Sequence, residues 1–483
     1  MAIYNVMNYG AVGNGSTDDT TAFQSAINAA GTNARIYVPG GGNFLITNTL
    51  QIDDDRVHII GDGIGASRIL FNPTAHDKIA FKFSKTSSLL TGCSIRDLTI
   101  YTSSLTYRKT AIQIVDTSNF VVDNVEITGT VGSPATGFCD TDNSSGSSKG
   151  IHTKGRDGLR VHNVFVYADY PLYIDKNPNI SGSPRPLEDI DQANFHNCIF
   201  RPNSNLRPCI NIVDGVAFAQ VSFTGQQAWV GGTYGIYWNS TTSDSSCAGL
   251  VLENVRYEQA AATTAYAVYL VTNYAGGLQQ IQLRNVYVGE GASGFYFRKC
   301  QSVSLQNVYV VTDTLEQLNV DSGVNEIEAL NCFWQVGGTV SVTDQTLLYE
   351  MPRYPNAMPL PNTFRYTNAN NVKRDQRISS SLSGPSITLA VNDIVTLAAN
   401  DDMVGLLVVV SSGNTVGMFA VGGSSNSVQE ISDPSSYYSV TKDTNGAVNV
   451  YHDATDDSYK IQNKRSGTLT FRTHLIGSYQ NIT

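Results

Sequence analysis

One short pattern recurs along most of the chain and constrains its fold more than any other feature. Apolar residues alternate with other residues on both sides of a central Asn or Asp, as in Leu159-Arg160-Val161-His162-Asn163-Val164-Phe165-Val166. A period of two indicates a β-strand, whereas a helical repeat would show a period near 3.6 residues. Successive copies follow at intervals of 22 to 39 residues, with centres at Asp97, Asn124, Asn163, Asn197, Gln220, Asn254, Asn285, Asn307 and Asn331.

Strands that return at this variable interval predict the coils of a parallel β-solenoid whose turns carry loops of different length. The central residues of successive coils then stand one above another. We expect their side chains to point inward and to hydrogen-bond along the stack, as Asn ladders do in cross-β structures. A buried Asn without such partners would be costly.

A second strand follows the Asn strand in most coils. Its alternation places Ile, Leu, Val and Phe inward and leaves the central residue of each strand facing outward. Because coils stack about 4.8 Å apart, these outward residues should form one row on one face of the solenoid. The row consists of Gln113, His152, Tyr173, Asn211, Tyr237, Tyr269 and Tyr296.

The two ends of the chain differ from this repeat. Thr17-Asp18-Asp19-Thr20 precedes an Ala-rich helical segment, residues 22–30, which we expect to cover the open first coil. We predict a β-helix domain over residues 1–345 and a Pro-rich linker over 346–377. Short strands with Ser, Gly and Asn turns predict an antiparallel β-sandwich over 378–483, for trimerisation or carbohydrate binding.

Composition excludes several classes of protein. The net charge of −10 gives no general attraction to phosphate, so we expect neither nucleic acid nor an anionic membrane surface as a partner. No apolar run approaches the roughly 20 residues of a membrane helix, and residues 1–6 do not resemble a secretory signal. The seven scattered cysteines form no C-x-x-C motif, and carboxylates are not densely clustered. We therefore expect no metal and no cofactor.

The opening residues 4–15, with Thr17-Asp18-Asp19-Thr20 and the following helix, resemble the N-terminal signature of one superfamily. It comprises the pectate-lyase and polygalacturonase-like right-handed parallel β-helices, and the resemblance extends over roughly residues 3–345. Residues 431–436 and 459–463 are similar to the C-terminal sandwich of bacteriophage tailspikes. The combination resembles a tailspike depolymerase. This implies a homotrimer on the phage virion that cleaves bacterial capsular or O-antigen polysaccharide, with an upstream virion-attachment segment missing here.

The signature marks the fold and not the reaction. The paired-aspartate, Gly-His-Gly and Arg-Ile-Lys motifs of polygalacturonases are absent, so no catalytic residue follows from the resemblance. Glycoside hydrolysis usually needs two carboxyl groups, about 5 Å apart in retaining enzymes and about 6.5–9.5 Å apart in inverting ones. The acids at strand ends that we consider catalytic candidates are Glu258, Asp175, Asp169 and Glu290.

Two pairings of these acids are expected. Glu258 and Glu290 follow the central Asn of neighbouring coils by four and five residues, so one coil step would separate them. Asp169 and Asp175 lie on either side of Tyr170-Pro171, which we interpret as a turn that lets the two carboxyls converge. Glu258 ranks first because it follows Tyr257 and adjoins the tyrosine row, and Asp175 ranks second.

Substrate contacts are expected on the outward row and beside it. Its tyrosines can offer ring faces or hydroxyl groups to sugars, or pack at a trimer interface. Basic residues can hold the carboxylate of an acidic sugar. The candidate binding residues are Tyr173, Tyr237, Tyr269, Tyr296, His152, Lys176, Arg201 and Arg298.

The leading hypothesis is hydrolysis of a host-surface polysaccharide. A second hypothesis is a polysaccharide lyase acting by β-elimination on a uronic-acid-containing glycan, for which His152 is the best histidine. A third is a carbohydrate receptor without catalysis, and a fourth is an adhesin-like or cell-wall-active β-helix.

Overall fold

The computed structural model divides the chain into two compact units, residues 1–358 and 359–483, which are described separately. It describes all residues except 87, 130–137, 141–147, 156, 179–188, 204–206, 242–246, 259–265, 274–276, 290, 312–315, 321–325, 331, 335–338, 343–345, 351–385, 400–402, 412–414, 423–426, 434–435, 456–457 and 480–483. Most of the expected linker, 346–377, therefore lies outside the described residues. No helix in the described part of the chain is long and apolar enough to cross a membrane.

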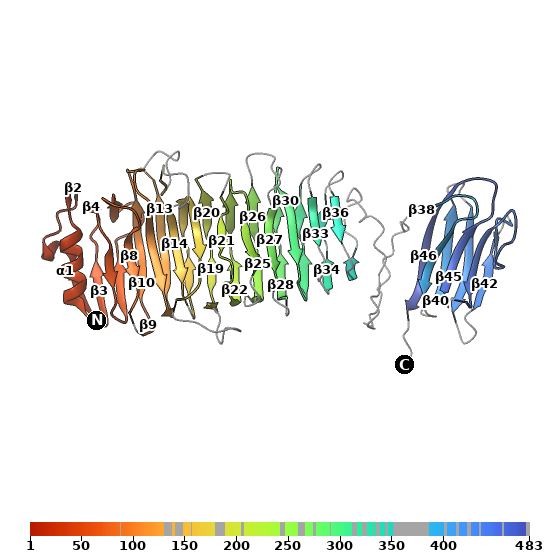
Figure 1. Ribbon diagram of the computed structural model, residues 1–483, viewed down its shortest axis with the longest axis horizontal. Coiled ribbons are helices and arrows are strands. Elements are labelled where there is room, and N and C mark those ends of the chain that lie inside the picture. Colours follow the sequence, from red (N-terminus) through yellow and green to blue (C-terminus); the bar gives the residue numbers. More distant parts are fainter. Residues whose placement is uncertain are drawn as a thin grey trace. The chain divides into compact units, whose positions relative to one another are not determined.

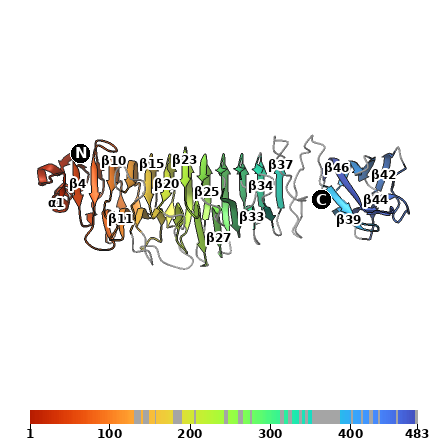
Figure 2. The same cartoon turned by 90° about the horizontal axis from the view of Figure 1, so that it is seen from above.

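The first unit is a parallel β-helix, which confirms the predicted fold class. Its strands pair in parallel with strands of the next coil, and the coils stack as a rod (Figures 1 and 2). The larger sheet, sheet A, has 24 strands. They are β1 (Ala2–Asn5), β2 (Asn14–Asp18), β3 (Ala34–Tyr37), β4 (Asn43–Ile46), β6 (Val57–Ile60), β7 (Arg68–Phe71), β10 (Ser94–Tyr101), β13 (Val121–Thr128), β15 (Arg160–His162), β16 (Phe165–Ala168), β18 (Ile190–Asp191), β19 (Asn194–His196), β20 (Ile199–Pro202), β22 (Phe218–Thr224), β23 (Gln227–Val230), β25 (Cys247–Glu253), β26 (Val255–Glu258), β28 (Leu278–Arg284), β29 (Tyr287–Val288), β31 (Val303–Gln306), β32 (Tyr309–Val310), β34 (Glu326–Leu330), β35 (Phe333–Trp334) and β37 (Thr346–Glu350).

The second long sheet, sheet B, contributes one strand per coil and carries the outward row. Its 11 strands run in unbroken order along the rod. They are β5 (Leu50–Ile52), β8 (Lys78–Phe83), β11 (Lys109–Val115), β14 (Lys149–Lys154), β17 (Tyr170–Ile174), β21 (Ile210–Ile212), β24 (Ile236–Ser240), β27 (Tyr266–Thr272), β30 (Ser293–Arg298), β33 (Glu316–Val320) and β36 (Thr339–Val342). A short sheet joins β9 (Leu90–Thr91) to β12 (Thr117–Ser118).

The recurring Asn lies at a bend within sheet A. Asn254 and Asn285 have φ angles of 56° and 52°, in the left-handed region that Asn tolerates better than most residues. The predicted ladder exists, because Asn285 Nδ2 donates to Asn254 Oδ1 at 3.0 Å and Asn307 Nδ2 to Asn285 Oδ1 at 3.0 Å. Its predicted inward direction was wrong. Asn163, Asn197, Asn254 and Asn285 are exposed, because the left-handed bend forms a corner of the coil and turns each side chain outward.

The predicted row on sheet B is confirmed in its register, but His152 is buried, at 5% exposed, because Gln113, Tyr173 and Asp175 pack around its ring. Direct strand pairing places Gln113 beside His152, His152 beside Tyr173, and Tyr173 beside Asn211. The same register continues to the last tyrosines, from Asn211 through Tyr237 and Tyr269 to Tyr296. The alternate residues of these strands are buried and form the core, and each large apolar side chain contributes about 1.5–3 kcal/mol through burial.

The N-terminal end is covered as predicted. Helix α1 (Thr20–Ala30) follows a 3-10 turn, η1 (Val6–Tyr9), and buries Phe23, Ala26 and Ile27. It contacts β1, β3 and β5 at one end of the rod (Figure 1). A helix there protects the sheet edge that an open first coil would expose.

The second unit is a β-sandwich of a five-stranded and a four-stranded sheet. Pairing is antiparallel except between β43 and β44, and residues from both sheets form the buried core, including Leu407, Phe419, Tyr459 and Ile461. The strands are β38 (Ser386–Leu389), β39 (Ile394–Ala399), β40 (Met403–Ser411), β41 (Val416–Gly422), β42 (Ser427–Ser432), β43 (Tyr438–Ser439), β44 (Val448–Asp453), β45 (Ser458–Asn463) and β46 (Leu469–Tyr479).

Candidate active site

Asp169 lies at the corner where a coil passes from β16 in sheet A to β17 in sheet B. Its side chain is 8% exposed, and its Oδ2 accepts hydrogen bonds from the backbone N–H groups of Asp140 at 3.2 Å and Ser148 at 3.1 Å. Backbone pairing of Phe138 with the neighbouring coil, at Ala168, holds the Asp140 segment beside it.

A second carboxyl group therefore lies next to Asp169. The hydroxyl of Ser148 donates to Asp140 Oδ2 at 2.9 Å while the backbone N–H of the same serine donates to Asp169. One buried residue thus contacts both carboxyls. Asp140 is partly exposed, so the pair has one buried and one accessible member.

The pKa of Asp169 is raised to about 6. Burial is the main cause and the neighbouring charge of Asp140 adds to it, while the two backbone hydrogen bonds oppose the change. A carboxyl with this pKa can hold a proton at mildly acidic pH, which is the property required of a general acid.

Aromatic and basic residues border this carboxyl pair on two sides. The guanidinium of Arg201 lies over the ring of Tyr167 at 5.1 Å, and Tyr167 is two residues before Asp169. On sheet B, Arg207 donates to the hydroxyl of Tyr170 at 2.7 Å and its guanidinium lies 5.1 Å from that ring. These groups surround the acid with cations and ring surfaces, which suit an anionic or polar ligand.

A buried lysine connects two loop segments near the same corner. Lys109 is 1% exposed, and its ammonium donates to the carbonyl groups of Ser104 and Cys139, the latter at 3.0 Å. Burial lowers the pKa of Lys109 to about 8. The lysine fixes the backbone immediately before Asp140.

Asp175 lies at the other end of β17 in a different environment. Its Oδ2 contacts His152 Nε2 at 3.2 Å and Lys154 Nζ at 3.0 Å, and its Oδ1 accepts from the backbone N–H of Lys176 at 2.8 Å. Burial alone would raise the pKa of Asp175, but the hydrogen bonds from His152 and Lys154 outweigh burial and lower it.

His152 is held in one orientation by two partners. Gln113 Nε2 lies 2.9 Å from His152 Nδ1, and because an amide nitrogen only donates, the ring proton is assigned to Nε2, facing Asp175. Burial lowers the pKa of His152 to about 4, although the hydrogen bond to Asp175 opposes this change. Both ring nitrogens of the neutral histidine are thus engaged.

The expected convergence of Asp169 and Asp175 was wrong. Tyr170 and Pro171 are not a turn but the first residues of β17, which spans Tyr170–Ile174. At about 3.3 Å per residue, a strand separates the two carboxyls by roughly 20 Å. Asp175 instead contacts His152, and the centres of the His152 and Tyr173 rings lie 5.3 Å apart in an edge-to-face arrangement.

The outward tyrosines further along sheet B stack on one another. The rings of Tyr237 and Tyr269 are 5.4 Å apart and 16° from parallel, and those of Tyr269 and Tyr296 are 4.7 Å apart and 15° from parallel. Tyr234 and Tyr266 flank this stack. Because the inner ring faces cover each other, the row offers mainly ring edges and hydroxyl groups to a ligand. Arg298 lies two residues after Tyr296 on β30.

Glu258 lies apart from the tyrosine row. It ends β26 in sheet A and pairs with Arg256, whose Nε donates to Glu258 Oε1 at 2.8 Å. Its neighbour Tyr257 is buried and donates to the carbonyl of Gly232 at 2.6 Å, so it does not face a ligand beside Glu258. Glu290, its expected partner, lies outside the described residues.

Sequence reasoning missed Asp140, Ser148, Lys149 and Arg207 as parts of these sites. The signal for Asp140 was the long segment between β13 and β14, because long loops on a rigid scaffold often carry function. Lys149 begins β14, and its ammonium lies 4.3 Å from the centre of the Tyr173 ring. Within the described ranges, no group of three or more His, Cys, Asp or Glu residues could hold a metal ion.

Comparisons with known proteins agree with the fold. A family model described as rhamnogalacturonase A/epimerase, pectate lyase-like, matches residues 3–170. No curated protein sequence matches the chain.

Solved structures similar to the chain include a tailspike protein, gp49, from Acinetobacter baumannii bacteriophage Fri1, described as a capsular polysaccharide depolymerase. It is 11% identical, with 98% of this chain and 85% of that chain covered and a TM-score of 0.48. A family 28 exopolygalacturonase from Yersinia enterocolitica is 10% identical, with 74% and 77% covered and a TM-score of 0.48. PfbA, a surface adhesin of Streptococcus pneumoniae, is 14% identical, with 72% and 92% covered and a TM-score of 0.46.

The family match and the observed coils concern the fold, and they agree with the resemblance found in the opening residues. Residues 3–170 therefore carry the sequence pattern of the pectate-lyase-like superfamily, and the coils that follow continue the same parallel β-helix.

Proposed function

We propose that this protein is a polysaccharide depolymerase that hydrolyses glycosidic bonds with the carboxyl pair Asp169 and Asp140. The observation that carries the proposal is the buried Asp169, whose pKa is raised to about 6 beside a second, accessible carboxyl. Two carboxyls in different environments are the usual equipment of a glycoside hydrolase.

In this mechanism Asp169 is the general acid. It donates its proton to the glycosidic oxygen while the bond from that oxygen to the anomeric carbon breaks, and the bonding electrons leave with the departing sugar. The Asp140 carboxylate faces the positive charge that develops on the remaining ring. A water molecule finally supplies the hydroxyl group to the anomeric carbon and returns a proton to the pair.

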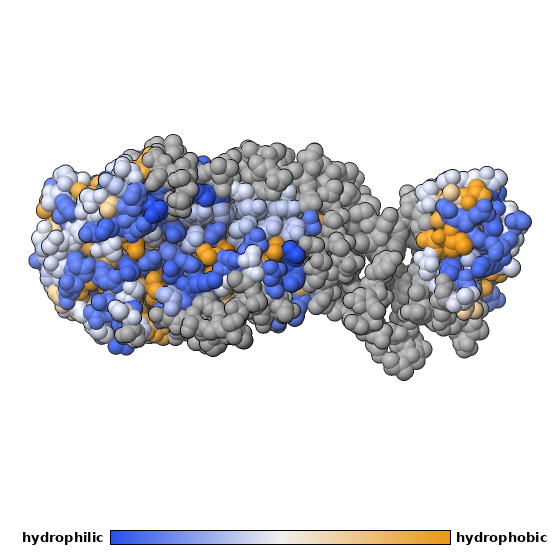
Figure 3. Space-filling view, in the orientation of Figure 1, coloured by the Kyte–Doolittle hydropathy of each residue, from blue (hydrophilic) through white to orange (hydrophobic). Residues whose placement is uncertain are grey.

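The polymer is proposed to lie across the outer face of sheet B. Direct strand pairing places an outward residue at each coil step of about 4.8 Å, close to the length of one sugar ring. His152, Tyr173, Tyr237, Tyr269 and Tyr296 belong to this row, and Lys176 and Arg298 add cations near the ends of its strands. Arg201 lies instead on β20 of sheet A, beside Tyr167. The visible face of the rod is mainly polar, with only small hydrophobic patches (Figure 3).

As biological setting we propose a homotrimeric phage tail spike that acts on capsular or O-antigen polysaccharide at the host surface. The support is the N-terminal signature, matched over residues 3–170 by the pectate-lyase-like family model, together with a β-helix followed by a β-sandwich. Light scattering tests the trimer, and a monomeric mass would contradict it.

A second candidate is a carbohydrate receptor without catalysis. It is favoured by the Asp175–His152–Gln113 network, in which every hydrogen-bonding atom of the imidazole already has a partner. The same observation counts against a lyase with His152 as its base, since neither ring nitrogen is available to remove a proton from substrate.

Product analysis separates these functions. The full chain is incubated with capsular polysaccharides, and chain length, new reducing ends and unsaturated-uronate absorbance are followed. Hydrolysis predicts shorter chains and reducing ends without the absorbance. Unsaturated products would replace the proposal by β-elimination, and binding without shortening would replace it by the receptor function.

A further inference from the structure

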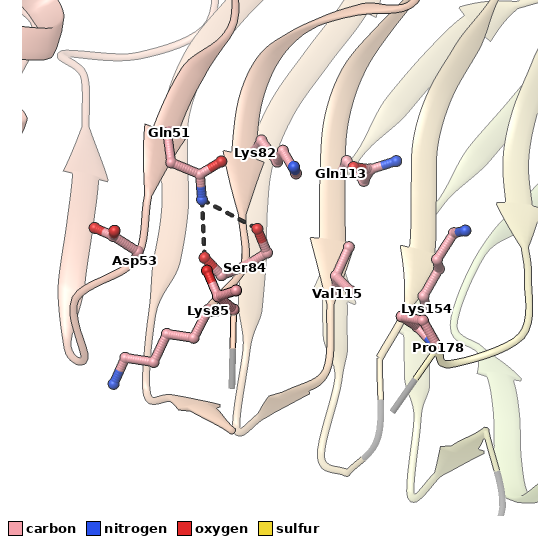
Figure 4. A pocket seen from close by; sticks show the side chains of 10 residues that line it. Gln51, Asp53, Lys82, Ser84, Lys85, Gln113, Val115, Lys154 and Pro178 are labelled. Carbon is pink, nitrogen blue, oxygen red and sulfur yellow. Dashed lines mark hydrogen bonds between the residues drawn. The ribbon is translucent and has the colours of Figure 1, made fainter. Parts of the chain in front are cut away.

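An open pocket of about 550 Å³ lies on the outer face of sheet B, in coils that the carboxyl pair does not occupy. Figure 4 shows Gln51, Lys82 and Gln113 on the successive strands β5, β8 and β11, with Lys154 on β14 beyond them. The register makes Gln51, Lys82 and Gln113 one continuous row, whereas Lys154 pairs with Val115, two residues further along the strands. The volume is within the range of small-ligand sites.

Two of the three lysines lining the pocket are already paired. Lys85 contacts Asp55 at 2.8 Å, and Lys154 contacts Asp175 at 3.0 Å. Lys82 has no carboxylate within ion-pair distance among the described residues, and it lies between the other polar groups of the row. The wall therefore holds one ammonium whose charge is not neutralised by a neighbour.

The amides on either side of Lys82 are held in place. Gln51 Nε2 donates to the carbonyl of Ser84 at 2.8 Å and to its hydroxyl at 3.0 Å (Figure 4). Gln113 Nε2 contacts His152 Nδ1 at 2.9 Å. With their nitrogens engaged in this way, both amides keep a carbonyl oxygen as an acceptor. An ammonium between two fixed acceptors matches a sugar that carries one carboxylate and several hydroxyl groups.

Asp53 lines another part of the pocket and is exposed. A carboxylate there accepts hydrogen bonds from sugar hydroxyls but repels a second negative charge. The pocket thus fits a singly charged sugar better than a densely charged polyanion such as a polyphosphate.

We propose that this pocket is an accessory subsite for one acidic, carboxylate-bearing sugar unit, held mainly by Lys82. Along the rod, three coil steps separate β8 from β17, which is roughly 14 Å at about 4.8 Å per coil. Along the strand, the register places Lys82 opposite Tyr173, four residues or about 13 Å from Asp169. One glycan chain of a few units can therefore occupy the subsite and the carboxyl pair together. This last point rests on the proposed function, whereas binding of the sugar itself does not.

The test uses methyl glucuronide and methyl glucoside, which differ only in the carboxylate, with binding to the full chain followed by ligand-observed NMR. We expect the glucuronide to bind more tightly than the glucoside. In Lys82→Gln its affinity should fall about tenfold or more, the range for a hydrogen bond to a charged group. Lys78→Gln is the matched control, because Lys78 lies on the same strand but does not line the pocket, and it should bind like the wild type.

Equal binding of the two glycosides, or an equal loss in Lys78→Gln, would overturn the subsite. Asp169→Asn separates this proposal from the proposed function. Retained glucuronide binding in that variant supports the subsite whether or not the polymer is cleaved. With an acidic polymer as substrate, Lys82→Gln should raise KM and leave kcat unchanged, and a loss confined to kcat would contradict a binding role.

Discussion

Asp169 and Asp175 flank the same five-residue strand, β17, and their environments are opposite. Asp169 is buried beside Asp140, and its pKa is raised to about 6. Asp175 receives hydrogen bonds from His152 and Lys154, and its pKa is lowered. The neighbours that each carboxyl meets across the coils decide whether it is suited to carry a proton or to hold an ion pair.

The comparison separates a reactive role from a positioning role. Asp169 resembles an acid kept protonated by burial and a like charge. Asp175 orients the neutral His152 and pairs with Lys154, next to the pocket that Lys154 helps to line. Substitutions at these acids test the difference.

Replacing Asp169 by Asn should abolish most catalysis. The amide keeps an oxygen that can accept the N–H groups of Asp140 and Ser148 but has no acidic proton, so we expect a fall in kcat of about 10²–10⁴-fold. The release of reducing ends measures it. Asp175→Asn is the matched variant from the same strand and should lose less than about tenfold. Equal losses in the two variants would remove the distinction between the acids.

The stability of the same two proteins should change differently with pH. Because the folded pKa of Asp169 is raised, its contribution to stability is fully present below about pH 4 and is lost as pH rises through about 6. The free energy of unfolding of Asp169→Asn, relative to that of the wild type, should therefore rise by up to about 3 kcal/mol between pH 4 and pH 7. Unfolding midpoints across this range measure the trend, and a flat difference would contradict the raised pKa.

Asp175→Asn should destabilise the protein by about 1–3 kcal/mol at pH 7, because it leaves the ammonium of Lys154 without its partner. The folded pKa of Asp175 is lowered, so its contribution is fully present above the ordinary carboxyl pKa of about 4 and is lost progressively as pH falls from there through the lowered folded pKa. Thermal unfolding at pH 7 and pH 3 checks both statements. The cost should be smaller at pH 3 than at pH 7, and an equal cost at the two pH values would indicate lost packing instead of lost charge.

The smallest expected change is the one that Asp140 causes in the pKa of Asp169. Its charge contributes to the raised pKa of Asp169 but is secondary to burial. Asp140→Asn should lower the pKa of Asp169 by less than about one unit, since burial remains. Carboxyl-carbon NMR titration of Asp169 measures the change directly, without relying on activity. A rise in this pKa would show that the two carboxyls do not interact as like charges.

The period-two pattern by itself determined the rod, its coils and the order of outward residues from Gln113 to Tyr296. Strand alternation dictates which side a residue faces, and stacking then sets its neighbours in the next coil. A different local pattern predicts the helix that covers the first coil, because the Phe23, Ala26 and Ile27 spacing has a helical period.

The alternation of apolar residues did not predict the backbone conformation or the side-chain directions at the corners of the coils. The Asn side chains point outward because Asn254 and its equivalents adopt a left-handed backbone, which alternation does not reveal. Asp140 contacts Ser148 and neighbours Asp169 only because residues 138–140 lie against the next coil, where Phe138 pairs with Ala168. The sequence alone therefore determined the scaffold and its faces, and the tertiary structure decided which acids meet, because their pKa values depend on burial and on charges that are distant in the chain.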